Sequence, residues 1–250
     1  MDKTIPIILV HGFRGAPVGL QDVQLALQEL GYRNVFVPPI PPFAGSKLTD
    51  YTPTSYAQYL HDFCQQNHLS HPILIGHSMG SVITAATLQQ YPDFFHTKAV
   101  LMSPISARTA APFRLIAPLS GLLPSRIIDY ITTKFMALTR DRDEFSRIMT
   151  LTHACGEIPP TKSELIQATK FSTRYSVADF PSPRNFLFLA GEHDRLIPRH
   201  QTIKLAQTFT AKTYFLPGTG HIHTYEQPQA TATVIDQFLQ DCLPTSNQAS

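Results

Sequence analysis

The sequence predicts an α/β fold, built on a mostly or wholly parallel sheet of about six strands that is flanked by helices. Six short runs of residues are almost continuously apolar, which is typical of parallel strands buried on both faces. Helical periodicity fills most of the intervals between them, and alternating strands and helices favour a doubly wound sheet. With 250 residues, of which 43% are hydrophobic, the chain is large enough to bury a sizeable core.

The expected elements follow from these runs in chain order. Strands are expected at residues 5–10, 35–37, 72–76, 98–103, 185–191 and 213–216. Leu20, Val23, Leu27 and Leu30 share one helical face, and Gly31 ends that helix. Further helices are expected at residues 55–67, 79–91 and 227–242.

One long segment, residues 107–183, interrupts the alternation of strands and helices. It contains no convincing strand, but Ile127, Ile131, Phe135 and Leu138 share a helical face. Farther along, Thr161 and Glu164 have the spacing of a capping box at the start of another helix. The sequence therefore predicts a helical insertion within a core that is formed by residues 1–106 and 184–250.

The charge pattern restricts the partners of the protein. There are 20 basic and 18 acidic residues, a net charge of +2, and the basic residues are scattered. This pattern argues against nucleic acid or an anionic membrane as the partner. No window approaches 18 uninterrupted apolar residues, so no stable membrane insertion is expected. The early run IPIILV is too short for a secretory signal and fits a strand.

The three cysteines favour a reducing compartment. Cys64, Cys155 and Cys242 are odd in number, lie far apart and lack the spacing of metal ligands. We therefore expect a cytoplasmic protein without structural disulfides. Cys64 and Cys242 fall within helical patterns and are expected to be small core residues, and Cys155 is expected to be buried in the insertion.

The stretch LIGHSMGS, residues 74–81, places Ser78 between Gly76 and Gly80 directly after an apolar run. A sharp turn from a strand into a helix, with one residue held at its apex, requires such small neighbours. The pattern G-x-S-x-G is common by chance and gains weight here because a predicted strand precedes it and a predicted helix follows. A turn of small residues without a chemical role is the alternative.

Four motifs occur in one order along the chain: HGFRG at 11–15, GHSMG at 76–80, GEHDRLIP at 191–198 and PGTGHIHTYEQP at 217–228. In these motifs the chain resembles the α/β-hydrolase superfamily, and the resemblance extends over nearly the whole sequence. It implies the α/β-hydrolase fold and the activity of a serine hydrolase. It also implies that the insertion at 107–183 is a helical cap over the active site.

The resemblance implies a triad of Ser78 as nucleophile, Asp194 as acid and His221 as base. A serine hydroxyl needs a base to take its proton, and a carboxylate must hold that histidine in the correct tautomer. Glu192 and His223 are the competing acid and base, but the motifs of the family match Asp194 and His221. His223 is then expected to be a pocket or loop residue, and Glu226, also in the last motif, a hydrogen-bonding residue.

The resemblance also implies an oxyanion hole, which stabilises the negative oxygen formed during attack on a carbonyl. Its two donors are backbone N–H groups, here those of Phe13 and Met79. Gly12 and Gly15 are expected to let the first loop approach the site, and His11 to brace that loop.

The most concrete expectation is a serine hydrolase that cleaves a small to medium, fairly apolar carboxylic ester through an acyl-enzyme intermediate. Its partner is a small-molecule substrate, and no cofactor is expected. A metal site is disfavoured because no H-E-x-x-H motif occurs. Thioesterase, lipase or acyltransferase chemistry on the same triad stays open, as do a slow-turnover small-molecule receptor and the oligomeric state.

Overall fold

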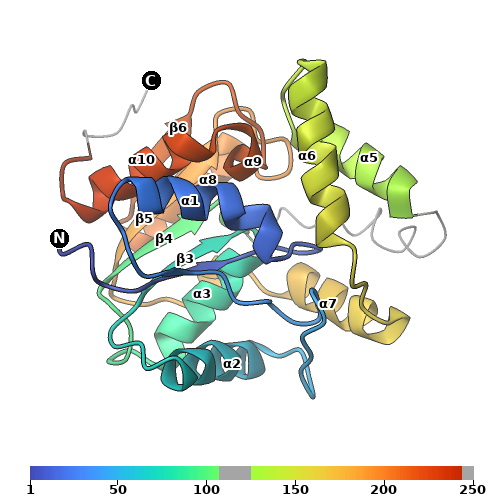
Figure 1. The fold of residues 1–250 in the computed structure, drawn as a ribbon. Coiled ribbons are helices and arrows are strands. Elements are labelled where there is room, and N and C mark those ends of the chain that lie inside the picture. The colour runs from blue at the N-terminus through green and yellow to red at the C-terminus, as the bar shows by residue number, and fades with distance from the viewer. Residues whose placement is uncertain (107–124, 244–250) are drawn as a thin grey trace.

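The computed structural model describes residues 1–106 and 125–243 (Figure 1). Its centre is a six-stranded sheet with the order β2-β1-β3-β4-β5-β6, and every neighbouring pair is parallel. The predicted fold class is therefore confirmed. The strands are β1 (Ile7–Val10), β2 (Val35–Phe36), β3 (Ile73–His77), β4 (Lys98–Met102), β5 (Asn185–Gly191) and β6 (Lys212–Leu216).

Helices cover both faces of the sheet because successive side chains of each strand point to opposite faces. In β5, Phe186 and Phe188 pack into one apolar cluster, and Leu187 and Leu189 pack into the other. The helices on the first face are α2 (Pro53–Gln66), α3 (Met79–Gln90) and α8 (Arg199–Phe209). Those on the second face are α1 (Gln21–Glu29), which follows the short helix η1 (Pro17–Leu20), and α10 (Pro228–Leu239).

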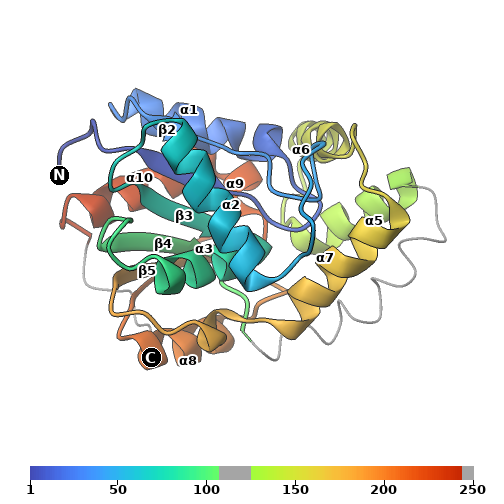
Figure 2. The ribbon, with the colours of Figure 1, turned by 90° about the horizontal axis from the view of Figure 1, so that it is seen from below.

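The described part of the insertion, residues 125–183, is helical and contains no strand. It consists of α5 (Ser125–Met136), α6 (Arg142–Cys155), α7 (Lys162–Arg174) and the short helix η3 (Val177–Asp179). Thr161 and Glu164 form the predicted capping box at the start of α7. Figures 1 and 2 show α5, α6 and α7 grouped at one end of the sheet rather than over its faces. Residues 107–124 and the tail 244–250 lie outside the described residues.

The apolar face of α5 lies differently from what a helix packed by its apolar stripe would show. Ile127, Ile131 and Phe135 are 46%, 49% and 39% exposed, whereas Asp129 and Thr133 are buried. The buried stripe is polar because its polar atoms have partners: Asp129 pairs with Arg14, and Thr133 Oγ1 donates to Thr152 Oγ1 of α6. These tertiary contacts, and not the apolar periodicity, determine how α5 is oriented.

The cysteines agree with the sequence prediction at two positions of three. Cys64 and Cys155 are buried, but Cys242 is exposed, so its assignment to the core was wrong. The reason is that α10 ends at Leu239 and Asp241 has a positive φ of 59°, which places Cys242 beyond the buried helical face. All three cysteines are free. Among the described residues, no helix is both long and apolar enough to cross a membrane.

Candidate active site

Ser78 forms the turn between β3 and α3, at the carboxyl end of the sheet. Its backbone has φ 54° and ψ −119°, a strained conformation for a residue with a side chain. The two glycines of the motif make this turn possible. A Cβ on Gly76 would lie 2.2 Å from the carbonyl oxygen of Gly80, and one on Gly80 would lie 2.2 Å from that of Val10. No larger residue fits at either position.

The structure brings together Ser78, His221 and Asp194, which follow three different strands. The distance from Ser78 Oγ to His221 Nε2 is 3.1 Å, and that from His221 Nδ1 to Asp194 Oδ2 is 2.9 Å. All three residues are buried. With the ring proton on Nδ1, His221 donates to Asp194 and presents the lone pair of Nε2 to the serine hydroxyl. The three side chains form one hydrogen-bonded row.

Asp194 is held as an anion by the donors around it. The backbone N–H groups of Leu196 and Ile197 donate to Oδ1, and the Ser103 hydroxyl donates to Oδ2 at 2.9 Å. Burial alone would raise the pKa of Asp194, but His221 and these hydrogen bonds lower it below its ordinary value of 3.8. The row therefore ends in an ionised carboxylate at neutral pH.

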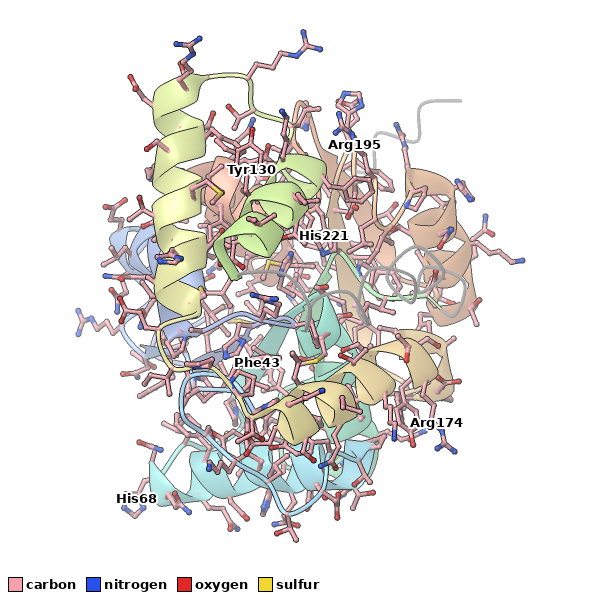
Figure 3. The ribbon with its side chains drawn as sticks, turned by 90° about the vertical axis from the view of Figure 1, so that its right-hand side faces the viewer. Phe43, His68, Tyr130, Arg174, Arg195 and His221 are labelled. Atoms are coloured by element: carbon pink, nitrogen blue, oxygen red, sulfur yellow. The ribbon has the colours of Figure 1, made fainter. Side chains whose placement is uncertain are left out.

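The backbone around His221 is fixed on two sides. His77 Nε2 donates to the carbonyl oxygen of His221 at 3.0 Å, and the N–H of His221 donates to the carbonyl oxygen of Met136, the last residue of α5, at 2.8 Å. Burial lowers the pKa of His77 to about 3, so this imidazole is neutral. Figure 3 shows His221 beside α5, the helix that carries Tyr130.

The loop after β1 lies directly against Ser78. A Cβ on Gly12 would lie 3.0 Å from Cβ of Ser78. His11 joins this loop to the next one, because its Nδ1 donates to the carbonyl oxygen of Gly12 at 3.1 Å and its Nε2 accepts from the N–H of Ile40 at 2.9 Å. Burial lowers the pKa of His11 to about 4, which keeps the ring neutral and able to accept. The predicted bracing role of His11 agrees with these contacts.

The two predicted oxyanion donors lie on opposite sides of the nucleophile along the chain contacts just described. Met79 is the first residue of α3, where backbone N–H groups have no partner within the helix. Phe13 directly follows Gly12, and its ring packs edge-to-face on Phe43 at 5.4 Å between centroids. Gly15 has no room for a side chain, since a Cβ there would lie 2.9 Å from Nδ1 of His11.

The competing residues lie elsewhere. His223 is buried and its Nδ1 bonds to Thr231 Oγ1 at 3.1 Å, away from Ser78. Glu192 accepts from the N–H of Gly218 at 3.3 Å, and Asp194, not Glu192, reaches His221. Within residues 1–106 and 125–243, no three histidine, cysteine, aspartate or glutamate side chains are placed to hold a metal ion.

Two features of the site were missed by the sequence analysis. Ser103 bonds to Asp194, and a signal existed, because this serine ends the strand next to the one that carries Ser78. The second feature is the ion pair of Arg14 with Asp129, at 2.8 Å, which joins the loop after β1 to α5. These residues are 115 positions apart, and no local pattern indicates their pairing.

Comparisons with known proteins give the wider context of this geometry. A family model described as "Alpha/beta hydrolase family" matches residues 7–234. No curated protein matches the sequence.

Solved structures of the same fold are numerous and distant in sequence. An esterase from Thermogutta terrifontis is similar with a TM-score of 0.77 and 20% identity, over 96% of this chain and 90% of the other. An esterase from Exiguobacterium antarcticum has a TM-score of 0.79 and 13% identity, over 94% and 92% of the two chains. For a bromoperoxidase from Bacillus anthracis the values are 0.78 and 17%, over 95% and 92%. These likenesses show the fold alone.

Proposed function

This chain belongs to the α/β-hydrolase family, and we propose that it is a serine hydrolase, a carboxylesterase that cleaves a small to medium, fairly apolar ester. The observation that carries the proposal is the hydrogen-bonded row of Ser78, His221 and Asp194. A hydroxyl that faces an imidazole, itself oriented by a carboxylate, is the arrangement that activates serine for attack on a carbonyl carbon.

In the first half of the proposed reaction, Ser78 Oγ attacks the ester carbonyl carbon while its proton passes to Nε2 of His221. Asp194 stays ionised and stabilises the imidazolium through the 2.9 Å hydrogen bond at Nδ1. The carbonyl π electrons move to the oxygen, and the N–H groups of Phe13 and Met79 donate to this oxyanion. When the C–O bond breaks, the leaving alcohol takes the proton from His221, and the acyl group stays on Ser78.

In the second half, water replaces the alcohol. His221 Nε2 removes a proton from the water as its oxygen attacks the acyl carbon, and a second oxyanion forms at the same donors. Ser78 Oγ then leaves and regains its proton from His221, which releases the carboxylic acid. No cofactor enters either half.

We further propose that α5, α6 and α7 belong to a cap that determines the choice of substrate. The end of α5 contacts the His221 backbone, so this helix lies beside the reacting atoms. Its accessible side chains are apolar, namely Ile127, Tyr130, Ile131 and Phe135. Apolar surface next to the nucleophile favours an uncharged, apolar acyl or alkyl group. Binding a free amino group needs an available carboxylate, but Asp129 is already paired with Arg14.

A panel of p-nitrophenyl esters of graded chain length, with an aryl amide and an acyl thioester added, tests the proposal. We expect turnover of short to medium esters by the wild type and none above background by Ser78→Ala. Faster cleavage of the thioester or the amide than of every ester would replace the proposed substrate class. The absence of turnover on the whole panel would contradict the proposed function.

A further inference from the structure

Glu226 lies where three segments of the chain meet beside His221. It is the last residue of α9 (His223–Glu226), and its carboxylate is largely buried. Oε1 accepts from the backbone N–H groups of Leu138 and Thr139, which follow α5, with 3.1 Å to Thr139. Oε2 accepts from the N–H of Gly220, the residue before His221, at 2.7 Å. One side chain thus joins the end of α5 to the histidine loop, residues 217–222.

The joint between α5 and the histidine loop is tight. The next N–H along the loop, that of His221, donates to the carbonyl oxygen of Met136 at 2.8 Å. A Cβ on Gly220 would lie 2.2 Å from the same oxygen, so only glycine allows this approach. Consecutive N–H groups of Gly220 and His221 are therefore bound by Glu226 and by α5. A shift of either partner displaces the backbone that carries the imidazole.

Helix stability does not explain a carboxylate at this place. Glu226 lies just beyond the carboxyl end of α5, where the helix dipole disfavours negative charge. Burial, together with the nearby carboxylate of Glu144, raises the pKa of Glu226, although three backbone N–H groups oppose this shift. A buried acceptor in such a position is retained for the donors that it binds, and these donors belong to two different segments.

We propose that Glu226 is a positioning residue that holds His221 in line with Ser78 by fastening the histidine loop to the end of α5. The inference rests on the proposed function, since it assigns Glu226 a part in the activity of His221. Through Glu226, the helix expected to contact substrate and the loop that carries the base move as one unit.

The test compares Glu226→Gln with a matched control, Glu192→Gln. Both residues are glutamates that bond a backbone N–H of the histidine loop, but Glu192 bonds that of Gly218 and makes no contact with α5. In Glu226→Gln one of the two oxygens becomes an N–H₂ group, which cannot accept from the N–H groups on its side. Glu226→Asp keeps the charge but is one methylene shorter, so it reaches one side only.

Three measurements are made on each variant. The concentration of active enzyme is first counted by the endpoint of fluorophosphonate labelling, so that a misfolded fraction does not lower the apparent kcat. The rate constant of that labelling reports the activation of Ser78 without a substrate. The low-field proton NMR resonance of His221 Nδ1–H reports the hydrogen bond to Asp194 in the resting enzyme.

For Glu226→Gln we expect kcat and the labelling rate constant to fall about 10- to 100-fold, as the loss of charge-assisted bonds and a small misplacement of the base predict. KM should change by less than about threefold, since ground-state binding is not the target. The Nδ1–H resonance should shift or broaden. Glu226→Asp should lie between the two, and Glu192→Gln should match the wild type.

The proposal is overturned if active Glu226→Gln keeps kcat, labelling rate and the resonance of the wild type, even where its thermal midpoint falls, because Glu226 is then structural only. It is equally overturned if Glu192→Gln shows the same losses. If Glu226→Gln does not fold, Glu226→Asp decides by the same criteria. Should the wild type hydrolyse no ester, the labelling rate and the resonance still test Glu226, so the two failures are distinguishable.

Discussion

Replacing Asp194 with asparagine tests the proposed role of this carboxylate while changing the size of the side chain very little. In the native site Oδ1 accepts from the backbone N–H groups of Leu196 and Ile197 at 2.9 and 2.8 Å. Oδ2 accepts from Nδ1 of His221 at 2.9 Å. The two backbone donors fix the amide oxygen of an asparagine on their side, so its N–H₂ group must face His221.

The consequence is a change of tautomer. The new amide donates to Nδ1 of His221, which must then accept, and the ring proton moves to Nε2. That nitrogen faces Ser78 Oγ at 3.1 Å and can no longer take its proton. In a serine protease the corresponding change lowers kcat by about 10⁴-fold. We expect a similar loss for Asp194→Asn, which corresponds to roughly 5 kcal/mol of transition-state stabilisation.

The assay is the initial rate of p-nitrophenyl ester hydrolysis at saturating substrate, with Ser78→Ala as the background and circular dichroism as the check on folding. A folded Asp194→Asn protein that keeps more than about a tenth of the wild-type kcat would refute the reasoning, since the correct tautomer is worth far more than tenfold.

The same variant has a separate effect on stability. The pKa of Asp194 in the folded protein lies below its ordinary value of 3.8. Its ionised form therefore stabilises the folded state above that value, and this contribution is lost as the pH falls through the lowered pKa. The unfolding free energy of Asp194→Asn should fall less steeply below about pH 4 than that of the wild type. Equal slopes in denaturant titrations would contradict this linkage.

Three further predictions follow from the geometry. His221→Ala should lower kcat by several powers of ten and His223→Ala by much less, and the reverse ranking in the ester assay would transfer the role of base to His223. Gly80→Ala should prevent the turn at Ser78, because the added methyl would lie 2.2 Å from a carbonyl oxygen of β1; an unchanged thermal midpoint would contradict this. Asp129→Asn should lower the unfolding free energy by about 1–3 kcal/mol, because the Arg14 guanidinium loses its charged partner. Denaturant titration measures that loss, and a change below about 0.5 kcal/mol would contradict it.

The sheet was predictable because its signal is local. Each buried parallel strand is a short apolar run, so the six runs alone indicate the six strands that the structure contains. The meeting of Ser78, Asp194 and His221 was likewise indicated by short motifs after successive strands, since the carboxyl ends of parallel strands lie at one edge. The catalytic roles of these three residues stay predictions until they are tested.

Contacts between distant segments were not predictable in the same way. The pairing of Arg14 with Asp129 and the acceptance of the Leu138 and Gly220 N–H groups by Glu226 depend on how α5 packs against the core. The apolar periodicity of α5 indicated a helix but not which stripe is buried, because the partners of its polar side chains come from other parts of the chain. The insertion as a separate cap also stays a prediction.

The central claim, that Ser78 is the nucleophile of an acyl-enzyme mechanism, is tested most directly by mass spectrometry after reaction with a fluorophosphonate. The account predicts one phosphonyl group per wild-type chain, located on the peptide that contains Ser78. It also predicts no labelling of Ser78→Ala, which should remain folded. Labelling of another serine in the wild type, or an undiminished adduct on Ser78→Ala, would contradict the account.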